Sequence, residues 1–177
     1  MKNLFTHLSL RTAYSLIDST IALDALIKKA KKHKVNALAI TDFLNTFNAI
    51  KFYQLCVENK IKPIIGCQIP IAEFEYENRQ PFVTLLSKDM QGYGNLMKLL
   101  SDIHSNKPKN KLANITIRQL INYNEGLILC TGGRRGVLGE NLLYSDDEKV
   151  CRDVLKLKDV FDDRLYLEIQ RTSYQAE

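Results

Sequence analysis

Hydrophobic and polar positions follow two alternating patterns along the chain. Short apolar runs predict strands, and longer stretches with an apolar residue every three or four positions predict helices. Strands are predicted over residues 4–10, 37–41, 61–65, 81–86, 126–131 and 165–169. Helices are predicted over residues 19–33, 45–59, 91–103, 117–123 and 146–160. Strands that alternate with helices in this way are typical of a parallel α/β sheet or barrel.

Capping residues and apolar stripes support the predicted helices. Ser19 or Thr20 can cap the first helix, Thr116 the fourth and Ser145 the fifth. In the second helix, several apolar residues are predicted to face the core in part, because they recur at helical spacing. These residues are Phe47, Ile50, Tyr53, Leu55 and Val57.

Turn residues divide the middle of the chain. Gly66 is predicted to end the third strand, after which residues 67–75 stay extended and the polar turn 77–80 returns the chain as a hairpin. Residues 106–114 are predicted to form an exposed loop. The glycine-rich segment 132–136 also contains two arginines and could bind an anion. Its spacing fits neither a Walker A loop nor a dinucleotide fingerprint, so we interpret it as a plain turn.

Length and composition indicate one globular domain of 177 residues with 45% hydrophobic residues. No apolar run reaches the roughly 18–20 residues that cross a bilayer, and the first residues lack the apolar stretch of a signal peptide. We therefore expect no membrane contact. The four cysteines, which form no CxxC pair, are predicted to be buried reduced thiols of a cytoplasmic protein. They are Cys56, Cys67, Cys130 and Cys151.

A basic run contributes much of the net charge of +5. It consists of Lys28, Lys29, Lys31, Lys32 and Lys34. The run falls at the end of a predicted helix, where cations complement the helix dipole. It is either a solvated helix end or a partner surface, and no interleaved aromatic residue indicates base stacking.

Polar residues that could carry chemistry are few. Asp42 and Gln68 fall at the carboxyl ends of two predicted strands, where parallel α/β folds place their active sites. A cluster of divalent metals needs several nitrogen or oxygen ligands that converge on one point. Of the three histidines, His33 and His104 fall late in predicted helices, and His7 lies on a predicted strand. We therefore predict no metal, no other cofactor and no catalytic residue in this chain.

Seven short segments of the chain resemble, in order and spacing, the N-terminal PHP (polymerase and histidinol phosphatase) domain of bacterial DNA polymerase III alpha subunits. They are residues 5–18, 39–45, 62–66, 92–96, 124–128, 131–133 and 166–171. The resemblance implies an irregular (β/α) barrel of about seven strands, a sheet closed on itself. Because no helix follows residues 165–169, we expect an incomplete barrel, a PHP domain over residues 1–177 truncated at its C-terminus. Tyr166 and Ile169 would then be partly exposed, or covered by another copy of the chain.

Active members of the family carry a multi-metal centre, and the chain departs from their pattern at most of the corresponding positions. The opening motif has histidines where this chain has Ser9 and Arg11. The other replaced positions are Phe43, Gln68, Phe82, Gly132 and Thr172. Of the site that the resemblance implies, Asp18 and the non-ligand His7 remain.

The remaining charges near this vestigial site allow more than one arrangement. Asp18 and Asp42 could form a leftover carboxylate pair. Alternatively, Arg11 pairs with one of them and replaces the positive charge of the metal. Asp42 could also cap the loop into the next helix. His7 is interpreted as a hydrogen-bonded core residue rather than a general base.

The resemblance implies that the parent protein is a replicative DNA-directed DNA polymerase, a nucleotidyltransferase whose catalytic carboxylates lie outside this chain. The domain itself is then a scaffold whose partners are the rest of the alpha subunit, a proofreading exonuclease subunit and, through the parent polymerase, DNA. One alternative is a residual metal-dependent 3'-5' exonuclease or phosphoesterase. Another is an independent nucleic-acid-binding module.

Overall fold

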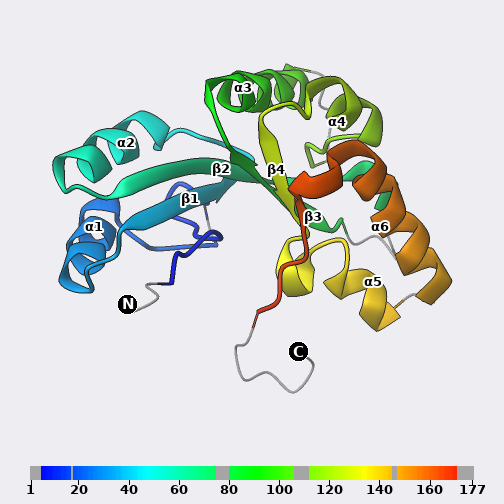
Figure 1. The fold of residues 1–177 in the computed structure, drawn as a ribbon, viewed down its shortest axis with the longest axis horizontal. Coiled ribbons are helices and arrows are strands. Elements are labelled where there is room, and N and C mark those ends of the chain that lie inside the picture. Colours follow the sequence, from blue (N-terminus) through cyan, green and yellow to red (C-terminus); the bar gives the residue numbers. More distant parts are fainter. Residues whose placement is uncertain (1–4, 17, 75–79, 106–111, 145–146, 171–177) are drawn as a thin grey trace. The chain divides into compact units, whose positions relative to one another are not determined.

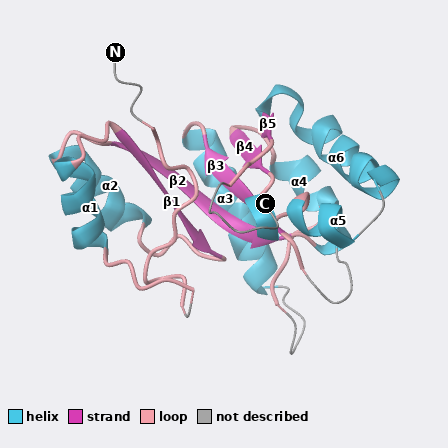
Figure 2. Ribbon diagram, turned by 90° about the horizontal axis from the view of Figure 1, so that it is seen from below, coloured by secondary structure: helices cyan, strands magenta, loops and turns pink. Residues whose placement is uncertain are grey.

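The computed structural model describes residues 5–16, 18–74, 80–105, 112–144 and 147–170 (Figure 1). The chain divides into two compact units, Met1–Cys67 and Gln68–Glu177. Helices and strands occur together in both units (Figure 2), which confirms the predicted α/β class. No helix in the described ranges is both long and apolar enough to cross a membrane.

The first unit contains one helix followed by a single strand–helix–strand unit. Its elements are α1 (Leu23–Lys32), β1 (Ala37–Phe43), α2 (Ala49–Glu58) and the first part of β2 (Lys62–Pro70). β1 and β2 are neighbours in the sheet. The Lys62 amide donates to the carbonyl oxygen of Asn36 at 2.8 Å, so both strands begin at the same edge. β2 continues through Gly66 to Pro70, which shows that the predicted strand end at Gly66 is wrong.

Side chains from both helices and from β1 share the core of the first unit. The buried residues of this core are Leu23, Ile27, Ala30, Leu38, Ile40, Phe52, Cys56 and Ile61. In α1 and α2 they recur every three or four residues, so one face of each helix is removed from water. At about 25 cal/mol per Å² of apolar surface, this burial is the main stabilising term of the unit.

The predicted strand over residues 4–10 is an extended segment without a regular ladder in its described part. The Ala39 amide donates to the His7 carbonyl at 3.1 Å, and the Thr41 amide donates to the Leu10 carbonyl at 2.8 Å. Two residues of β1 therefore span three residues of this segment, and the register is broken as in a β-bulge. The Thr41 hydroxyl accepts from the Leu10 amide at 2.8 Å instead.

Two further predictions in the first unit are wrong. α1 starts after Ala22 without a side-chain cap, and the Ser19 hydroxyl donates to the Arg11 carbonyl instead. α2 buries Ala49, Phe52 and Cys56. The predicted inner face of α2 is mostly outside: its exposed members, all at least 52% exposed, are Phe47, Ile50, Tyr53 and Val57. The helix has two apolar stripes, and spacing alone does not tell them apart.

The second unit holds most of the helices. Its helices are α3 (Met90–Ser105), α4 (Ile117–Tyr123), α5 (Gly139–Tyr144) and α6 (Asp147–Phe161), with short 3₁₀ helices at Ala72–Phe74, Gly133–Arg135 and Asp162–Arg164. Its remaining strands are β3 (Phe82–Ser87), β4 (Leu127–Cys130) and β5 (Leu165–Tyr166). Thr116 and Gln119 form a capping box at the start of α4, which confirms the predicted cap. α5 was not predicted.

Strand directions in the second unit are mixed. β3 pairs with β4 in antiparallel fashion, with Thr84 opposite Cys130, and β4 pairs with β5 in parallel. An entirely parallel sheet is therefore the wrong expectation. The predicted return of the chain is present, because the Ile71 amide donates to the Pro81 carbonyl at 3.1 Å. Most of the predicted turn 77–80 and loop 106–114, and the cap Ser145, lie outside the described residues.

The last strand is shorter than predicted, since only Leu165 and Tyr166 are in the ladder. Tyr166 and Ile169 are exposed, as predicted. Three cysteines are buried, but Cys151 is exposed on α6, which corrects the expectation for that thiol.

Two glycines from separate resembling segments meet in the second unit. A Cβ atom on Gly92 in α3 would overlap the carbonyl oxygen of Gly126, which has a φ of +70° before β4. The contact lets the backbones of α3 and the α4–β4 turn approach each other closely, and only a residue without a side chain permits it. Tight packing explains why glycine stands at both positions.

Candidate functional site

A buried carboxylate organises the N-terminal loop of the first unit. Asp42 lies near the carboxyl end of β1 and is 1% exposed. Its Oδ1 accepts from the Thr12 amide at 2.6 Å and from the Ser15 hydroxyl at 2.6 Å. Its Oδ2 accepts from the Thr12 hydroxyl at 2.8 Å. Hydrogen bonds to an ionised acceptor are stronger than neutral ones, so Asp42 fastens the loop to β1.

The hydroxyl donors around Asp42 are themselves held in place. Asn48 Nδ2 donates to the Thr12 hydroxyl oxygen at 2.9 Å, and the Phe43 amide donates to the Ser15 hydroxyl oxygen at 2.9 Å. Three of the roughly four lone-pair directions of the Asp42 carboxylate are therefore used by donors of the same unit. About one direction is left, so this carboxylate could offer a cation at most one lone pair without losing a hydrogen bond. We call Thr12, Ser15, Asp42 and Asn48 the Asp42 cluster.

Arg11 forms the predicted pair with a carboxylate, and its partner is Asp18. Arg11 Nη1 lies 2.6 Å from Asp18 Oδ2, and the side chains are 16% and 36% exposed. The guanidinium also lies over the Phe43 ring, 5.1 Å from its centroid. Arg11 and Phe43 occupy positions where the resemblance implies metal ligands. A fixed positive charge and an aromatic ring now stand together there, which disfavours a bound cation.

The opening segment keeps its histidine in a different role from the one predicted. His7 is exposed, and its ring meets the edge of the Phe5 ring at a centroid distance of 4.8 Å. The interpretation of His7 as a hydrogen-bonded core residue is therefore wrong. Ser9 is exposed as well. Neither residue belongs to the Asp42 cluster.

The second unit brings two of its predicted positions together. The backbone of Gly132 has a φ of +83°, and a Cβ atom there would overlap the carbonyl oxygen of Phe82. Any side chain at this position would require a backbone shift. Gln68 is buried, and its Nε2 lies 3.4 Å from the Thr84 hydroxyl, at the long limit for a hydrogen bond. Thr172 lies outside the described residues.

These residues do not fit a metal centre. In the part of the chain that the structure describes, no three His, Cys, Asp or Glu side chains come close enough to hold an ion. Cys67 is a further buried group near Asp42, since its Sγ donates to the Asp42 carbonyl at 3.2 Å. Burial raises the pKa of this thiol far above its ordinary value, so it stays protonated. Among the described residues, these groups supply no set of ligands that converges on one point.

Sequence reasoning missed the hydroxyl and amide partners of Asp42. Thr12, Ser15 and Asn48 carry no chemical motif of their own, and two of them lie about thirty residues before Asp42. A usable signal was present, because Thr12 and Ser15 lie in segment 5–18 and Asp42 in segment 39–45, both of which resemble the family.

The match to a family model covers residues 7–172 and is described as a PHP domain. The chain belongs to the PHP domain family. It is 36% identical over 173 residues to DNA polymerase III subunit alpha from Escherichia coli K12, and 32% identical over 173 residues to the same subunit from Vibrio cholerae. Each alignment covers 98% of this chain and 15% of the relative, so the chain spans a small part of these proteins.

A solved structure shares the fold. The chain superposes with a TM-score of 0.55 on a candidate metal-dependent phosphoesterase from Bifidobacterium adolescentis. The likeness covers 85% of this chain and 73% of that protein at 11% identity. It supports the fold of an incomplete PHP-type barrel, and the low identity carries no argument about activity.

Proposed function

We propose that this chain is the PHP-domain portion of a replicative DNA-directed DNA polymerase alpha subunit and supports that polymerase structurally, without catalysis of its own. The observation that carries the proposal is the Arg11–Asp18 pair beside Phe43, at positions where active family members hold metal. The Asp42 cluster adds to it, because the buried carboxylate is satisfied by hydrogen bonds from its own unit. Both arrangements stabilise a fold, and the residues that the structure describes leave no ligand set for an ion.

Metal content and hydrolysis test the absence of catalysis. The purified chain is incubated with Mn²⁺ and Zn²⁺, desalted and analysed for metal, and then assayed on a 3'-labelled oligonucleotide and on a phosphate monoester. We expect less than one metal ion per ten chains and no hydrolysis above the blank. Stoichiometric metal that is lost in an Asp42→Asn variant, together with hydrolysis lost in the same variant, would favour the residual phosphoesterase instead.

We further propose that the domain docks a proofreading exonuclease subunit through the exposed apolar stripe of α2. Ile50, Tyr53 and Val57 are from 52% to 71% exposed at successive turns of α2, and Phe47, which comes just before the helix, is 78% exposed. An apolar helix face of this kind is costly to leave in water and is typical of a protein contact. The similarity to polymerase alpha subunits makes a replication partner the most suitable occupant.

Calorimetric titration with the exonuclease subunit of the same bacterium tests the docking. We expect association that Ile50→Asp weakens by at least tenfold, because a carboxylate would be buried without a partner. Leu155→Asp is the matched control, since Leu155 is 56% exposed on α6. No association of the unaltered chain would contradict docking. Equal weakening by both variants would contradict the assignment to α2.

A further inference from the structure

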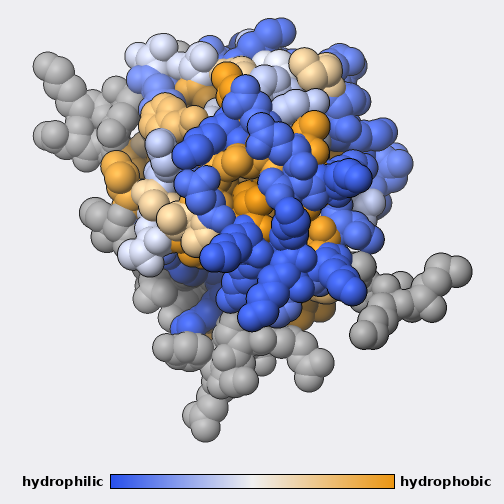
Figure 3. All heavy atoms as spheres, turned by 90° about the vertical axis from the view of Figure 1, so that its left-hand side faces the viewer, coloured by the Kyte–Doolittle hydropathy of each residue, from blue (hydrophilic) through white to orange (hydrophobic). Residues whose placement is uncertain are grey.

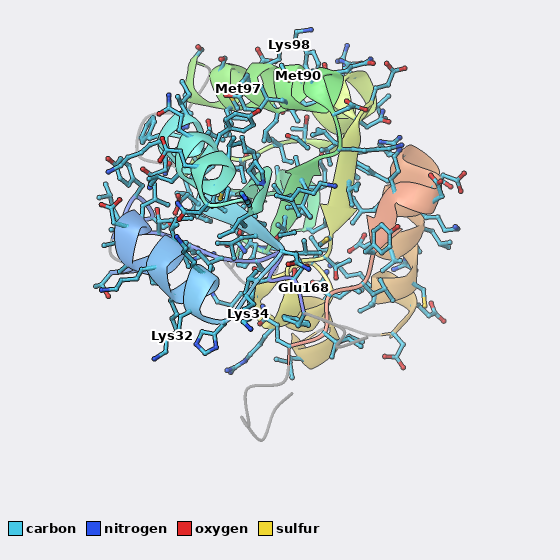
Figure 4. All side chains as sticks on the ribbon, turned by 60° about the vertical axis from the view of Figure 1, so that its left-hand side comes forward. Lys32, Lys34, Met90, Met97, Lys98 and Glu168 are labelled. Carbon is cyan, nitrogen blue, oxygen red and sulfur yellow. The ribbon has the colours of Figure 1, made fainter. Side chains whose placement is uncertain are left out.

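Seven lysines gather at one edge of the first unit, where α1 and α2 end. This basic edge consists of Lys28, Lys29, Lys31, Lys32, Lys34, Lys60 and Lys62, all exposed. Figure 4 shows Lys32 and Lys34 at the end of α1. Figure 3 views the side of the molecule on which α1 and α2 lie, and hydrophilic side chains cover most of the described surface there.

Two hydrogen bonds hold the parts of the basic edge together. Lys31 Nζ donates to the Asn59 side-chain oxygen at 3.2 Å, and the Lys62 amide donates to the Asn36 carbonyl at 2.8 Å. Both helices also end alike: Lys34 and Lys60 follow the caps with φ values of +55° and +56°. Glycine or asparagine is usual in this conformation, so a lysine at both sites costs about 1 kcal/mol or more each.

The net charge of this region equals that of the whole chain. Residues 22–62 contain eight lysines against Asp24, Asp42 and Glu58, which gives +5, and the whole chain is also +5. Asp24 lies 3.7 Å from Lys51, which is outside the basic edge, and Asp42 is buried in its hydroxyl cluster. Among the residues that the structure describes, none of the seven lysines forms an ion pair. Glu58 is the one acidic residue left to offset them in this segment.

The helix dipoles explain only part of this charge. Lys29, Lys31 and Lys32 lie in the last turn of α1, where a cation contributes about 0.3–1 kcal/mol. The last turn of α2 contains no basic residue. Lys34, Lys60 and Lys62 lie beyond the helices. Stabilisation of the helix dipoles therefore does not explain their positive charge.

We propose that the basic edge binds the phosphate backbone of duplex DNA without reading its sequence. Lysine is a compact, strongly hydrated charge that suits phosphate, and it is depleted in the core of protein–protein interfaces. No aromatic residue is interleaved with the run from Lys28 to Lys34, so base stacking is not part of the contact. This contact goes beyond the scaffold and docking roles and involves neither the Asp42 cluster nor the α2 stripe.

Fluorescence anisotropy with a labelled 20-base-pair duplex of mixed sequence tests the proposal. If four of the lysines each neutralise a phosphate, log K should fall with log salt at a slope of about −3.6. The affinity then drops about 150-fold between 50 and 200 mM salt. In the variant Lys32→Gln, Lys34→Gln, Lys62→Gln we expect at least tenfold weaker binding at 50 mM salt and a slope closer to zero by about 2–3.

A matched variant separates location from total charge. Lys88→Gln, Lys98→Gln, Lys158→Gln removes the same charge from exposed positions of the second unit and should change the affinity less than threefold. Thermal melting checks that both variants fold. Absence of DNA binding at 50 mM salt, equal loss in both variants, or tighter binding to polyglutamate than to DNA would each overturn the proposal. Exonuclease titration of the edge variant should be unchanged, so this test can fail independently of the docking proposal.

Discussion

Replacing Asp42 by asparagine tests whether the Asp42 cluster holds the fold. Asparagine has the same shape, but one carboxylate oxygen becomes an NH₂ donor. At the Oδ1 position this donor faces the Thr12 amide and the Ser15 hydroxyl. At the Oδ2 position it faces the Thr12 hydroxyl, whose oxygen already accepts from Asn48. Either orientation loses at least one of the three hydrogen bonds that Asp42 accepts. The bonds that remain are made to a neutral group.

The cost follows from these bonds. A hydrogen bond to a charged group contributes about 1.5–3 kcal/mol, and a neutral one about 1 kcal/mol. Loss of one bond, with weakening of the other two to neutral values, gives about 2.5–7 kcal/mol. Native domains have an unfolding free energy of only about 5–15 kcal/mol, so the effect is large. Asp18→Asn removes the same charge from a partly exposed pair and should cost less than about 1 kcal/mol.

Equilibrium urea unfolding, followed by far-ultraviolet circular dichroism at pH 7, measures both variants against the unaltered chain. We expect the midpoint for Asp42→Asn to fall well below that for Asp18→Asn, with similar slopes. Ser15→Ala should also destabilise, since it removes one donor to Asp42 and the acceptor of the Phe43 amide. If Asp42→Asn is neutral or stabilising, the reasoning is refuted. Gains of stability on removing a residue are typical of functional sites, and Asp42 would then be a ligand-binding group.

Further predictions concern the glycine contact and the thiols. Gly126→Ala places a methyl group against Gly92 at a φ of +70°, so we expect a loss above about 2 kcal/mol in the same titration, and a neutral result contradicts the close approach. Burial raises the pKa of Cys56 and Cys130 to about 11, so a thiol reagent at pH 8 should label exposed Cys151 alone in the native chain. Rapid labelling of a second thiol would contradict this. Because the unfolded thiols titrate near 9, the stability from these shifts is complete below pH 9 and is lost as the pH rises towards 11. Urea titrations across that range should show the decline, and a shallower one in Cys130→Ala.

Elements specified by neighbouring residues were predictable from the sequence. The capping box of Thr116 and Gln119 and the apolar spacing of the following turn mark the start of α4. The run 37–41 is apolar and lies between polar segments, and it is the buried strand β1. In both cases the signal lies within a few residues, and its physical cause, a cap or a buried apolar run, is local.

Charge balance also made part of the candidate site predictable. Arg11 was expected to pair with a carboxylate, because a guanidinium near a buried acidic group needs a partner. Sequence alone left Asp18 and Asp42 as equal candidates. The tertiary structure selects Asp18. The Asp42 carboxylate accepts hydrogen bonds from Thr12 and Ser15, and Arg11 forms its ion pair with Asp18.

Features that depend on contacts between residues distant in sequence could be determined only from the tertiary structure. α2 has two apolar stripes of similar hydrophobicity, and packing against α1 and β1 buries the one that contains Phe52. The segment before Thr12 has the alternation of a strand, but its register against β1 slips by one residue between His7 and Leu10. Each outcome depends on the shape of a surface supplied by residues about twelve to thirty positions away, and a pattern read along one segment does not contain that surface.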